Sequence, residues 1–276
     1  MGAGEGAEEV SQPVENKPKI LIIANQKGGV GKTTTAINLA TALAAVGRRV
    51  LVLDLDPQGN ASTGLGIPQS ARGHGTYDLL IGAAPVAKAV VSCGIPRLDV
   101  VPSTVDLAGA ELELIDMERR EYRLRDALRS EMPAYDYIFV DCPPSLNLLT
   151  LNGLVAADAV LVPLQCEFFA LEGLTHLLKT LDRVRRSFNP ELELQGVVLT
   201  MADTRNNLTA MVAADVRQFL GDKVYETIIP RNVRVSEAPS HGKPVLLYDF
   251  KCAGSQAYIQ LAREILRREG EKEEAT

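Results

Sequence analysis

The feature that most constrains the fold is a glycine-rich segment, QKGGVGKTTT (26–35), which lies between a short apolar run and a helical pattern. The apolar run 19–25 predicts a buried strand, and apolar side chains at three- and four-residue steps predict a helix over 33–46. Glycines in such a connection let backbone N–H groups converge on a polyphosphate at the positive end of the helix. The segment therefore predicts a phosphate-binding loop within an α/β domain.

The rest of the chain repeats this alternation of short apolar runs and longer helical patterns. Further strands rich in Ile, Val and Leu are expected at 49–55, 98–102, 135–141, 159–164 and 193–200, and further helices at 168–187 and 253–268. Continuous apolar runs of this kind are typical of strands covered by helices on both faces. The pattern predicts a three-layer, doubly wound, mostly parallel sheet flanked by helices.

The formal charge of −6 at pH 7 is concentrated at the two ends of the chain. Residues 1–17 hold four acids and one base, and residues 262–276 hold five acids and four bases. We expect a disordered acidic leader over 1–17, a single P-loop domain over 18–268, and a flexible acidic tail over 269–276. A chain of 276 residues buries enough surface to fold without disulfides or a structural metal.

Several features favour a cytoplasmic protein. The acidic beginning of the chain lacks the apolar region of a signal peptide, and no run of 18 apolar residues could span a bilayer. The four cysteines, at 93, 142, 166 and 252, lie far apart without a CxxC pair, which favours reduced thiols.

Within the glycine-rich segment, the residue types indicate separate roles. Lys32 is expected to reach the β- and γ-phosphates, and the Thr33 hydroxyl to ligate Mg²⁺. The remaining contacts of the cradle are expected from Gly28, Gly29, Val30, Gly31 and Thr34. The usual pattern GxxxxGK[ST] would place glycine where this chain has Gln26, and a second lysine, Lys27, stands beside it. From the residues alone, Lys27 is equally well explained as a solvated surface lysine.

Three aspartates at the carboxyl ends of expected strands support a nucleotide site. Asp54 and Asp56 follow the second strand, and Asp141 ends a later one, so all three can converge on the crevice beyond the sheet. Asp141 suits a carboxylate that holds Mg²⁺ through water. Asp56 is better placed to orient or deprotonate an attacking water. A strand-ending aspartate can also be a solvated turn residue, but three beside one phosphate loop make that explanation weak.

Several motifs together resemble the ParA/Soj family of chromosome- and plasmid-partition ATPases, over about residues 19–265. They are QKGGVGKTTT, DLDPQGN (54–60), DCPPSLNLLTLN (141–152), QCEFFALEGL (165–174) and IPRNVRVSEAPSHGKP (229–244). KGGVGKT alone marks the wider deviant-Walker superfamily of P-loop NTPases, which includes MinD-like proteins, whereas the combination with the last motif is much narrower.

The resemblance implies an ATP- and Mg²⁺-dependent sandwich homodimer. In it Lys27 reaches the partner subunit's phosphates, much as an arginine finger does, and Gly28 packs where the two phosphate loops meet. Asp56 corresponds to the hydrolytic aspartate and Thr33 to the Mg²⁺ ligand. Pro230 and Asn232 correspond to the residues that contact the adenine ring in the family.

The resemblance further implies that the ATP-bound dimer binds double-stranded DNA without sequence preference, through Arg205 and Arg234. Residues 205–251 hold seven bases and five acids, so an acidic protein can still present a basic face there. A ParB-like centromere-binding partner is implied to stimulate a weak intrinsic ATPase and release the DNA. The implied location is the cytoplasm, on the nucleoid.

Two alternatives use the same core. A MinD-like membrane-associated positioning ATPase would need a basic amphipathic C-terminal helix, whereas this chain ends in AREILRREGEKEEAT, with a net charge of −1. An electron-transfer ATPase would need surface cysteines that hold an iron–sulfur cluster between subunits. Cys142 and Cys166 are better explained as small buried fillers.

Overall fold

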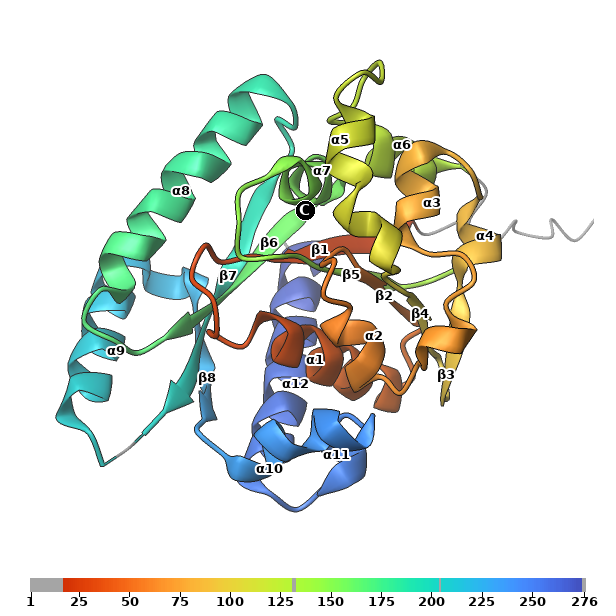
Figure 1. Cartoon of the computed structure of the whole chain (residues 1–276). Coiled ribbons are helices and arrows are strands. Elements are labelled where there is room, and N and C mark those ends of the chain that lie inside the picture. The colour runs from red at the N-terminus through yellow and green to blue at the C-terminus, as the bar shows by residue number, and fades with distance from the viewer. Residues whose placement is uncertain (1–16, 131–132, 204, 275–276) are drawn as a thin grey trace, which may run out of the picture.

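Eight strands form one sheet, in the order β3-β4-β2-β5-β1-β6-β7-β8 (Figure 1). The structure, a computed structural model, describes residues 17–130, 133–203 and 205–274. The strands are β1 (Lys19–Ile23), β2 (Val50–Asp54), β3 (Val91–Ile95), β4 (Leu98–Val101), β5 (Tyr137–Asp141), β6 (Ala159–Gln165), β7 (Glu193–Ala202) and β8 (Val224–Pro230). Every neighbouring pair runs parallel except β3 with β4. The expected mostly parallel sheet is confirmed.

Helices lie on both sides of this sheet (Figure 1). The α-helices are α1 (Lys32–Ala45), α2 (Asn60–Gly64), α3 (Thr76–Ile81), α4 (Val86–Ala89), α5 (Ala110–Leu114), α6 (Arg123–Arg129), α7 (Leu148–Ala156), α8 (Ala170–Ser187), α9 (Asn207–Leu220), α10 (Val233–Glu237), α11 (Val245–Tyr248) and α12 (Ala253–Glu274). The helices expected at 33–46 and 168–187 correspond closely to α1 and α8.

Alternate residues of the central strands pack into two separate hydrophobic cores, one on each face of the sheet. Leu51 and Leu53 of β2 pack into the core beneath α7 and α8, whereas Val50 and Val52 pack into the core beneath α1 and α12. All four side chains are fully buried, as expected for a strand covered on both faces. The fold therefore has three layers, with the sheet in the middle.

Two strands were not expected from the sequence, and both lie at the edges of the sheet. β3 alternates half-buried and exposed residues, and β8 exposes Glu226, so neither has the continuous apolar run of a central strand. Edge strands are covered less completely than central ones, so they do not need a continuous apolar run, and that run is the feature from which strands were predicted.

The last helix continues beyond the boundary expected at residue 268. Glu269 of α12 accepts hydrogen bonds from Lys19 Nζ at 2.6 Å and Gln195 Nε2 at 3.1 Å, and it also pairs with the Tyr137 hydroxyl. These contacts join α12 to the beginnings of three strands. Residues 275–276 and the expected leader up to residue 16 lie outside the described residues. Among the helices described, none is both long and apolar enough to cross a membrane.

Candidate nucleotide site

The glycine-rich segment forms a compact loop between β1 and α1. Gly29 and Gly31 have φ angles of +74° and +90°, a left-handed conformation that glycine adopts without steric cost. Val30 between them is buried, and its carbonyl accepts a hydrogen bond from Thr200 Oγ1 of β7 at 2.8 Å. The first turn of α1 holds no acidic residue, so its positive end is not neutralised locally. This geometry is that of an anion-binding loop.

Lys32 lies buried at the start of α1. Its Nζ donates to the Lys27 carbonyl at 3.1 Å, which draws the side chain back over the loop. The loop is held in turn by Asn25, whose Oδ1 accepts from Lys27 N at 3.0 Å. Burial lowers the pKa of Lys32, while the nearby carboxylates of Asp141 and Asp56 oppose that shift. The expected phosphate-binding cation and two of the expected aspartates therefore share one site.

Asp54 and Asp141 are register partners at the carboxyl ends of β2 and β5. Asp54 accepts hydrogen bonds from Ser62 N at 2.7 Å and Ser62 Oγ at 2.6 Å, so its carboxylate holds the turn that leads into α2. Burial raises the pKa of Asp54 to about 6, although the bonds from Ser62 oppose the shift. Asp54 converges on the crevice as expected, but its contacts are structural.

Asp141 is fully buried, and neither of its carboxylate oxygens has a hydrogen-bond partner among the described residues. Burial raises its pKa well above the usual range, and the charge of Asp54 adds to this effect. The Thr33 hydroxyl lies near enough to lower the pKa without reaching full hydrogen-bond geometry. An unpartnered buried carboxylate is costly, and a hydrated Mg²⁺ would supply the missing partners. The residues present therefore fit this cation.

Asp56 lies almost buried in the turn that follows β2. Its Oδ1 accepts from Gln58 N at 3.0 Å, and its carbonyl accepts from Gly59 N at 2.9 Å. These two bonds hold Asp56 close to Lys32, where the charge of its carboxylate raises the pKa of Lys32. A positioned carboxylate beside a phosphate loop can orient a water for attack.

Lys27 is half-exposed and forms an ion pair with Glu167, which follows β6. Sequence reasoning missed Glu167, because an acid in a loop between a strand and a helix has no periodicity to single it out. The ion pair holds the Lys27 ammonium within its own chain.

A cavity of about 280 Å³, with a lining that mixes polar and apolar side chains, lies beside Thr33 and Thr34. It is enclosed by parts of α1, α2 and the segment 238–245, and its other lining residues are Ile37, Asn38, Asn60, Thr63, Gly64, Ala238, Pro239, Lys243, Pro244 and Val245. Sequence reasoning missed Asn38 of α1 and also Asn60 and Thr63, which share one turn of α2; the two helices meet only in the fold.

The structure does not bring the expected adenine contacts, Pro230 and Asn232, into this cavity. Pro230 ends β8 in register with Ala202. Asn232 is the N-cap of α10, where its Oδ1 accepts from Arg234 N at 2.9 Å and Val235 N at 3.4 Å.

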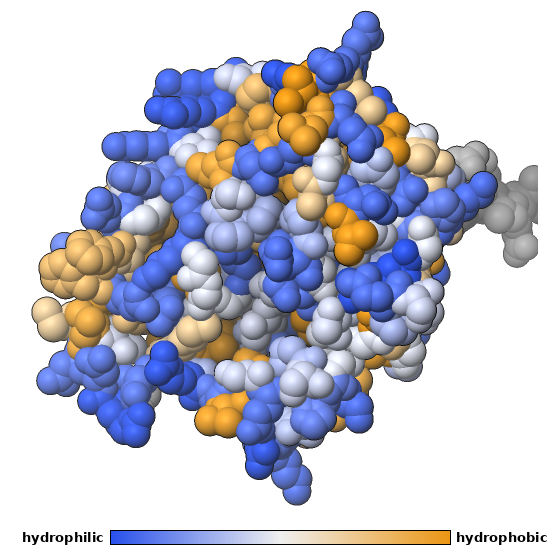
Figure 2. All heavy atoms as spheres, viewed as in Figure 1, coloured by the Kyte–Doolittle hydropathy of each residue, from blue (hydrophilic) through white to orange (hydrophobic). Residues whose placement is uncertain are grey.

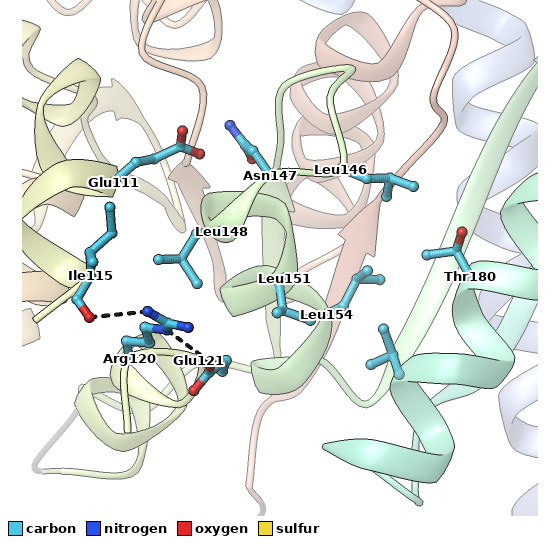
Figure 3. A pocket seen from close by; sticks show the side chains of 11 residues that line it. Glu111, Ile115, Arg120, Glu121, Leu146, Asn147, Leu148, Leu151, Leu154 and Thr180 are labelled. Atoms are coloured by element: carbon cyan, nitrogen blue, oxygen red, sulfur yellow. Dashed lines mark hydrogen bonds and ion pairs between the residues drawn. The ribbon is translucent and has the colours of Figure 1, made fainter. Parts of the chain in front are cut away.

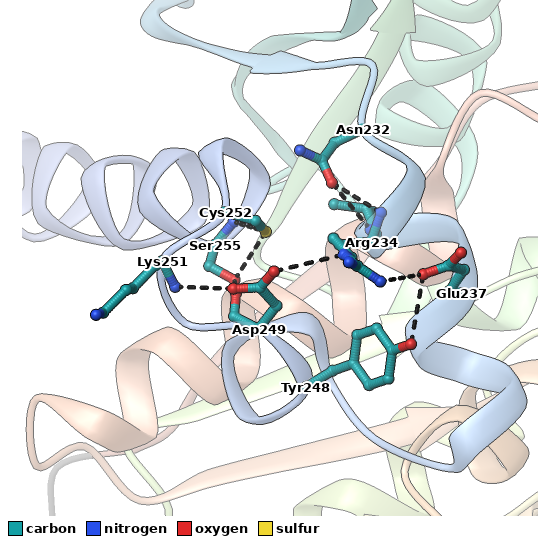
Figure 4. A network of polar contacts seen from close by, with 9 residues as sticks. Asn232, Arg234, Glu237, Tyr248, Asp249, Lys251, Cys252 and Ser255 are labelled. Atoms are coloured by element: carbon teal, nitrogen blue, oxygen red, sulfur yellow. Dashed lines mark hydrogen bonds and ion pairs between the residues drawn. The ribbon is translucent and has the colours of Figure 1, made fainter.

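The two arginines expected to bind DNA are exposed and paired with carboxylates. Arg205 binds Asp203 through Nε at 2.8 Å and Nη2 at 2.7 Å, and it lowers the pKa of Asp203 to about 2. Arg234 forms ion pairs with Glu237 at 3.0 Å and with Asp249 at 3.6 Å, and Figure 4 shows it between these two carboxylates. Both guanidinium groups therefore carry a local counter-charge.

Cys93 and Cys252 are half-buried. Cys142 and Cys166 are buried, as expected for small fillers. The described ranges contain no group of three or more His, Cys, Asp or Glu side chains arranged to hold a metal ion by themselves.

Comparison with known proteins identifies relatives along nearly the whole chain. The chain is 64% identical over 261 residues to the chromosome partitioning protein ParA of Caulobacter vibrioides, covering 94% of this chain and 97% of that relative. It is 52% identical over 247 residues to the sporulation initiation inhibitor protein Soj of Bacillus subtilis, covering 90% and 98%. A family model described as an AAA domain matches residues 18–194.

Solved structures share the fold. A cobyrinic acid a,c-diamide synthase from Mycobacterium smegmatis with bound ADP and magnesium is 38% identical, with a TM-score of 0.79 over 91% of this chain and 94% of that one. The septum site-determining protein MinD of Pyrococcus horikoshii, complexed with Mg-ADP, is 26% identical, with a TM-score of 0.74 over 90% and 96%. Because one fold carries differently named proteins, the fold by itself does not assign the activity. The chain is, however, 52–64% identical to partition proteins over almost their full length. This chain therefore belongs to the ParA/Soj family of chromosome-partitioning ATPases.

Proposed function

We propose that this protein is a slow ATP hydrolase that pairs into a homodimer when it binds ATP and Mg²⁺. The buried, unpartnered carboxylate of Asp141 beside Lys32 carries the nucleotide assignment, because that arrangement calls for a cation. The M. smegmatis and P. horikoshii neighbours, which bind ADP with magnesium, support the same ligands here.

Within this site, Thr33 would ligate Mg²⁺ and Asp141 would hold it through water. Bound Mg²⁺ would neutralise charge that develops on the phosphates during hydrolysis. The loop amides and Lys32 would position the phosphates, and Asp56 would orient the attacking water.

Gly28 supports pairing of two subunits. A Cβ added at Gly28 would meet no atom of the described chain within 4 Å, and the φ angle there is not left-handed. Neither backbone conformation nor packing within one chain therefore requires glycine at this position, in contrast to Gly29 and Gly31. A close approach by a second chain would require it. In that dimer, Lys27 would leave Glu167 and reach the partner subunit's phosphates.

The variant Gly28→Val tests the dimer. It is expected to bind ATP within about threefold of the wild-type affinity but to remain a monomer, because the added side chain separates the two loops. Size-exclusion chromatography with Mg²⁺ and a non-cleavable ATP analogue measures the change. The Asp56→Ala variant serves as the positive control, since blocked turnover should preserve the dimer. Co-elution of Gly28→Val with the Asp56→Ala dimer would contradict the role of Gly28.

The dimer would bind double-stranded DNA through Arg205 and Arg234, with each subunit contributing one set. Because both arginines are paired with carboxylates, DNA phosphates would have to displace Asp203, Glu237 and Asp249. Such a surface binds weakly and is strongly salt-dependent.

Arg234→Glu is expected to abolish DNA retention while leaving ATP-driven dimers intact. The substitution replaces a cation by an anion beside Glu237 and Asp249, which repels phosphate. Filter binding across a salt series measures it. The matched variant Glu237→Gln removes the competing carboxylate and should strengthen binding, by about two- to tenfold at low salt. If Arg234→Glu still retains DNA at low salt, the DNA surface lies elsewhere.

The DNA-bound dimer would lie on the nucleoid, and a ParB-like centromere-binding protein would stimulate hydrolysis and so release the DNA. The support for this step is the membership of the ParA/Soj family and the relatives named as chromosome partitioning proteins. Phosphate release measured with and without a ParB-like protein from the same source tests it, and an unchanged rate would remove the partner from the cycle.

A further inference from the structure

Arg72 is a buried arginine that packs against the turn after β2. Arginine side chains mostly lie in water, and Figure 2 shows hydrophilic residues over much of the visible surface, whereas Arg72 is only 7% exposed. Its Nε and Nη2 donate to the Ile67 carbonyl at 3.2 Å and 2.9 Å, Nη2 also donates to Thr63 Oγ1 at 2.8 Å, and Nη1 donates to the Ser103 carbonyl at 3.3 Å. None of these acceptors is charged, so the hydrogen bonds hold the guanidinium without neutralising it.

Arg120 shows how a more exposed arginine binds a carbonyl. It faces a groove of about 470 Å³ lined by residues of α5, α7 and α8, where its Nη1 donates to the Ile115 carbonyl at 3.0 Å (Figure 3). Its Nε donates to Glu121 at 3.1 Å, and its side chain is 43% exposed. Arg72 lies deeper, and removing a charge from water is costly. Burying Arg72 among neutral acceptors therefore costs free energy that the placement of Arg120 does not.

The guanidinium of Arg72 lies against Gly59, three residues after Asp56. A Cβ added at Gly59 would lie 2.5 Å from Arg72 Nη1, and the φ angle of Gly59 is +64°, so both the contact and the backbone require glycine. Gly59 N donates to the Asp56 carbonyl at 2.9 Å, and the Gly59 carbonyl accepts from Thr63 Oγ1 at 3.0 Å. Because Thr63 Oγ1 accepts from Arg72, the arginine reaches the turn of Asp56 both directly at Gly59 and through Thr63.

Arg72 also joins this turn to the segment that follows β4. The Ser103 carbonyl accepts from Arg72, and Ser103 N donates to Ser62 Oγ at 3.0 Å. Ser62 is the residue that satisfies the carboxylate of Asp54 at the end of β2. Burial lowers the pKa of Arg72, and the negative charge of Asp54 opposes this shift. The segments after β2 and β4 are therefore linked through one buried cation.

We propose that Arg72 is a positioning residue for ATP hydrolysis, which holds the turn at Gly59 and so keeps the Asp56 carboxylate in place. This role rests on the proposed function, in which Asp56 orients the attacking water. A carboxylate with that task has to be held to within about 0.5 Å, and a turn that contains glycine is free to move unless a neighbour restricts it. The planar guanidinium suits this purpose, because it donates to several acceptors in fixed directions.

Arg72→Met removes the donors but keeps an apolar side chain. It is expected to lower single-turnover phosphate release by about 10–10²-fold and to keep ATP affinity within about threefold, because the turn loosens while the phosphate loop is unchanged. Arg72→Lys keeps a buried cation without the planar fork, so a loss of at least about fivefold is expected there too. Circular dichroism establishes that the variants fold. A wild-type rate in folded Arg72→Met or folded Arg72→Lys would overturn the proposal.

Arg123→Met is the matched control. Arg123 Nε donates to the Leu80 carbonyl at 2.8 Å, and a Cβ added at the left-handed glycine Gly82 would lie 2.9 Å from Arg123 Nη2, so its contacts resemble those of Arg72. These contacts join α6 to α3 rather than to the turn of Asp56. The turnover of Arg123→Met should stay within about twofold of the wild-type rate. If Arg72→Met and Arg123→Met hydrolyse ATP equally fast, Arg72 does not position Asp56.

A double-mutant cycle asks whether Arg72 acts through Asp56. In the Asp56→Ala background, adding Arg72→Met should lower turnover by less than about twofold, because the group that the arginine positions is already missing. A further loss as large as the loss in the wild-type background would show that Arg72 acts independently of Asp56, and the proposal would fail.

Amide hydrogen exchange measures the turn itself, in the full-length chain without nucleotide. Residues 57–63 should exchange at least about fivefold faster in Arg72→Met than in the wild type or in Arg123→Met. Unchanged exchange would remove the contact on which the role depends. Full turnover in Asp56→Ala would contradict the proposed function, and the role of Arg72 with it. Loss of turnover in Asp56→Ala but not in Arg72→Met would contradict the role of Arg72 alone.

Discussion

Replacing Lys32 with alanine is expected to abolish ATP binding, with a loss of affinity of about 10²–10³-fold or more. The ammonium is buried over the loop, where it would make charge-assisted hydrogen bonds to phosphate, each contributing about 1.5–3 kcal/mol. The variant also removes a cation that opposes the charge of Asp141 and Asp56. Titration with a fluorescent ATP analogue in Mg²⁺ measures the affinity.

The other lysine of the loop is the matched control. Lys27 is half-exposed and paired with Glu167, so Lys27→Ala should keep the affinity of a single subunit for ATP within about threefold. Circular dichroism on both variants separates lost binding from lost folding. A normal ATP affinity in folded Lys32→Ala would remove the phosphate-loop assignment.

Replacing Asp56 with alanine is expected to lower ATP turnover by about 10²–10⁴-fold, the range for loss of a positioned acid–base group. ATP affinity should change little, because the proposed site places the phosphates against the loop and Lys32 rather than against Asp56. Single-turnover phosphate release measures the chemical step, and equilibrium titration measures the affinity.

Asp56→Asn distinguishes chemistry from architecture. The amide oxygen of asparagine can still accept from Gln58 N, which preserves the turn, but the neutral group orients or deprotonates water poorly. Both variants should therefore lose turnover alike. If Asp56→Asn retains full turnover, the aspartate serves the turn, and another group positions the water.

Local sequence patterns predicted the central part of the fold and the phosphate loop. Strands β1, β2 and β5 are predictable because burial on both faces requires a continuous run of apolar residues. Gly29 and Gly31 are predictable because the left-handed backbone conformation of the loop favours glycine. The edge strands β3 and β8 lack such a run and were missed.

Contacts between distant segments could not be predicted in this way. Glu167 meets Lys27 across 140 positions, and Thr200 meets the carbonyl of Val30 across 170. Such pairs depend on which strands become neighbours in the sheet, and the local periodicity of a sequence does not predict the strand order. The counter-charges of Arg205 and Arg234 were also missed, since side-chain geometry decides which nearby acid forms an ion pair.

The amino-acid sequence by itself determined the class of fold, the glycine-rich loop between β1 and α1, and the aspartates at the strand ends, because each follows from residue type and spacing within a few positions. Only the tertiary structure decided that Asp54 is satisfied by Ser62 while Asp141 lacks a partner. It also decided that Arg72 is buried against Gly59. Burial and hydrogen bonding depend on what surrounds a side chain in space. Chemically identical carboxylates therefore acquire different roles only when the chain has folded.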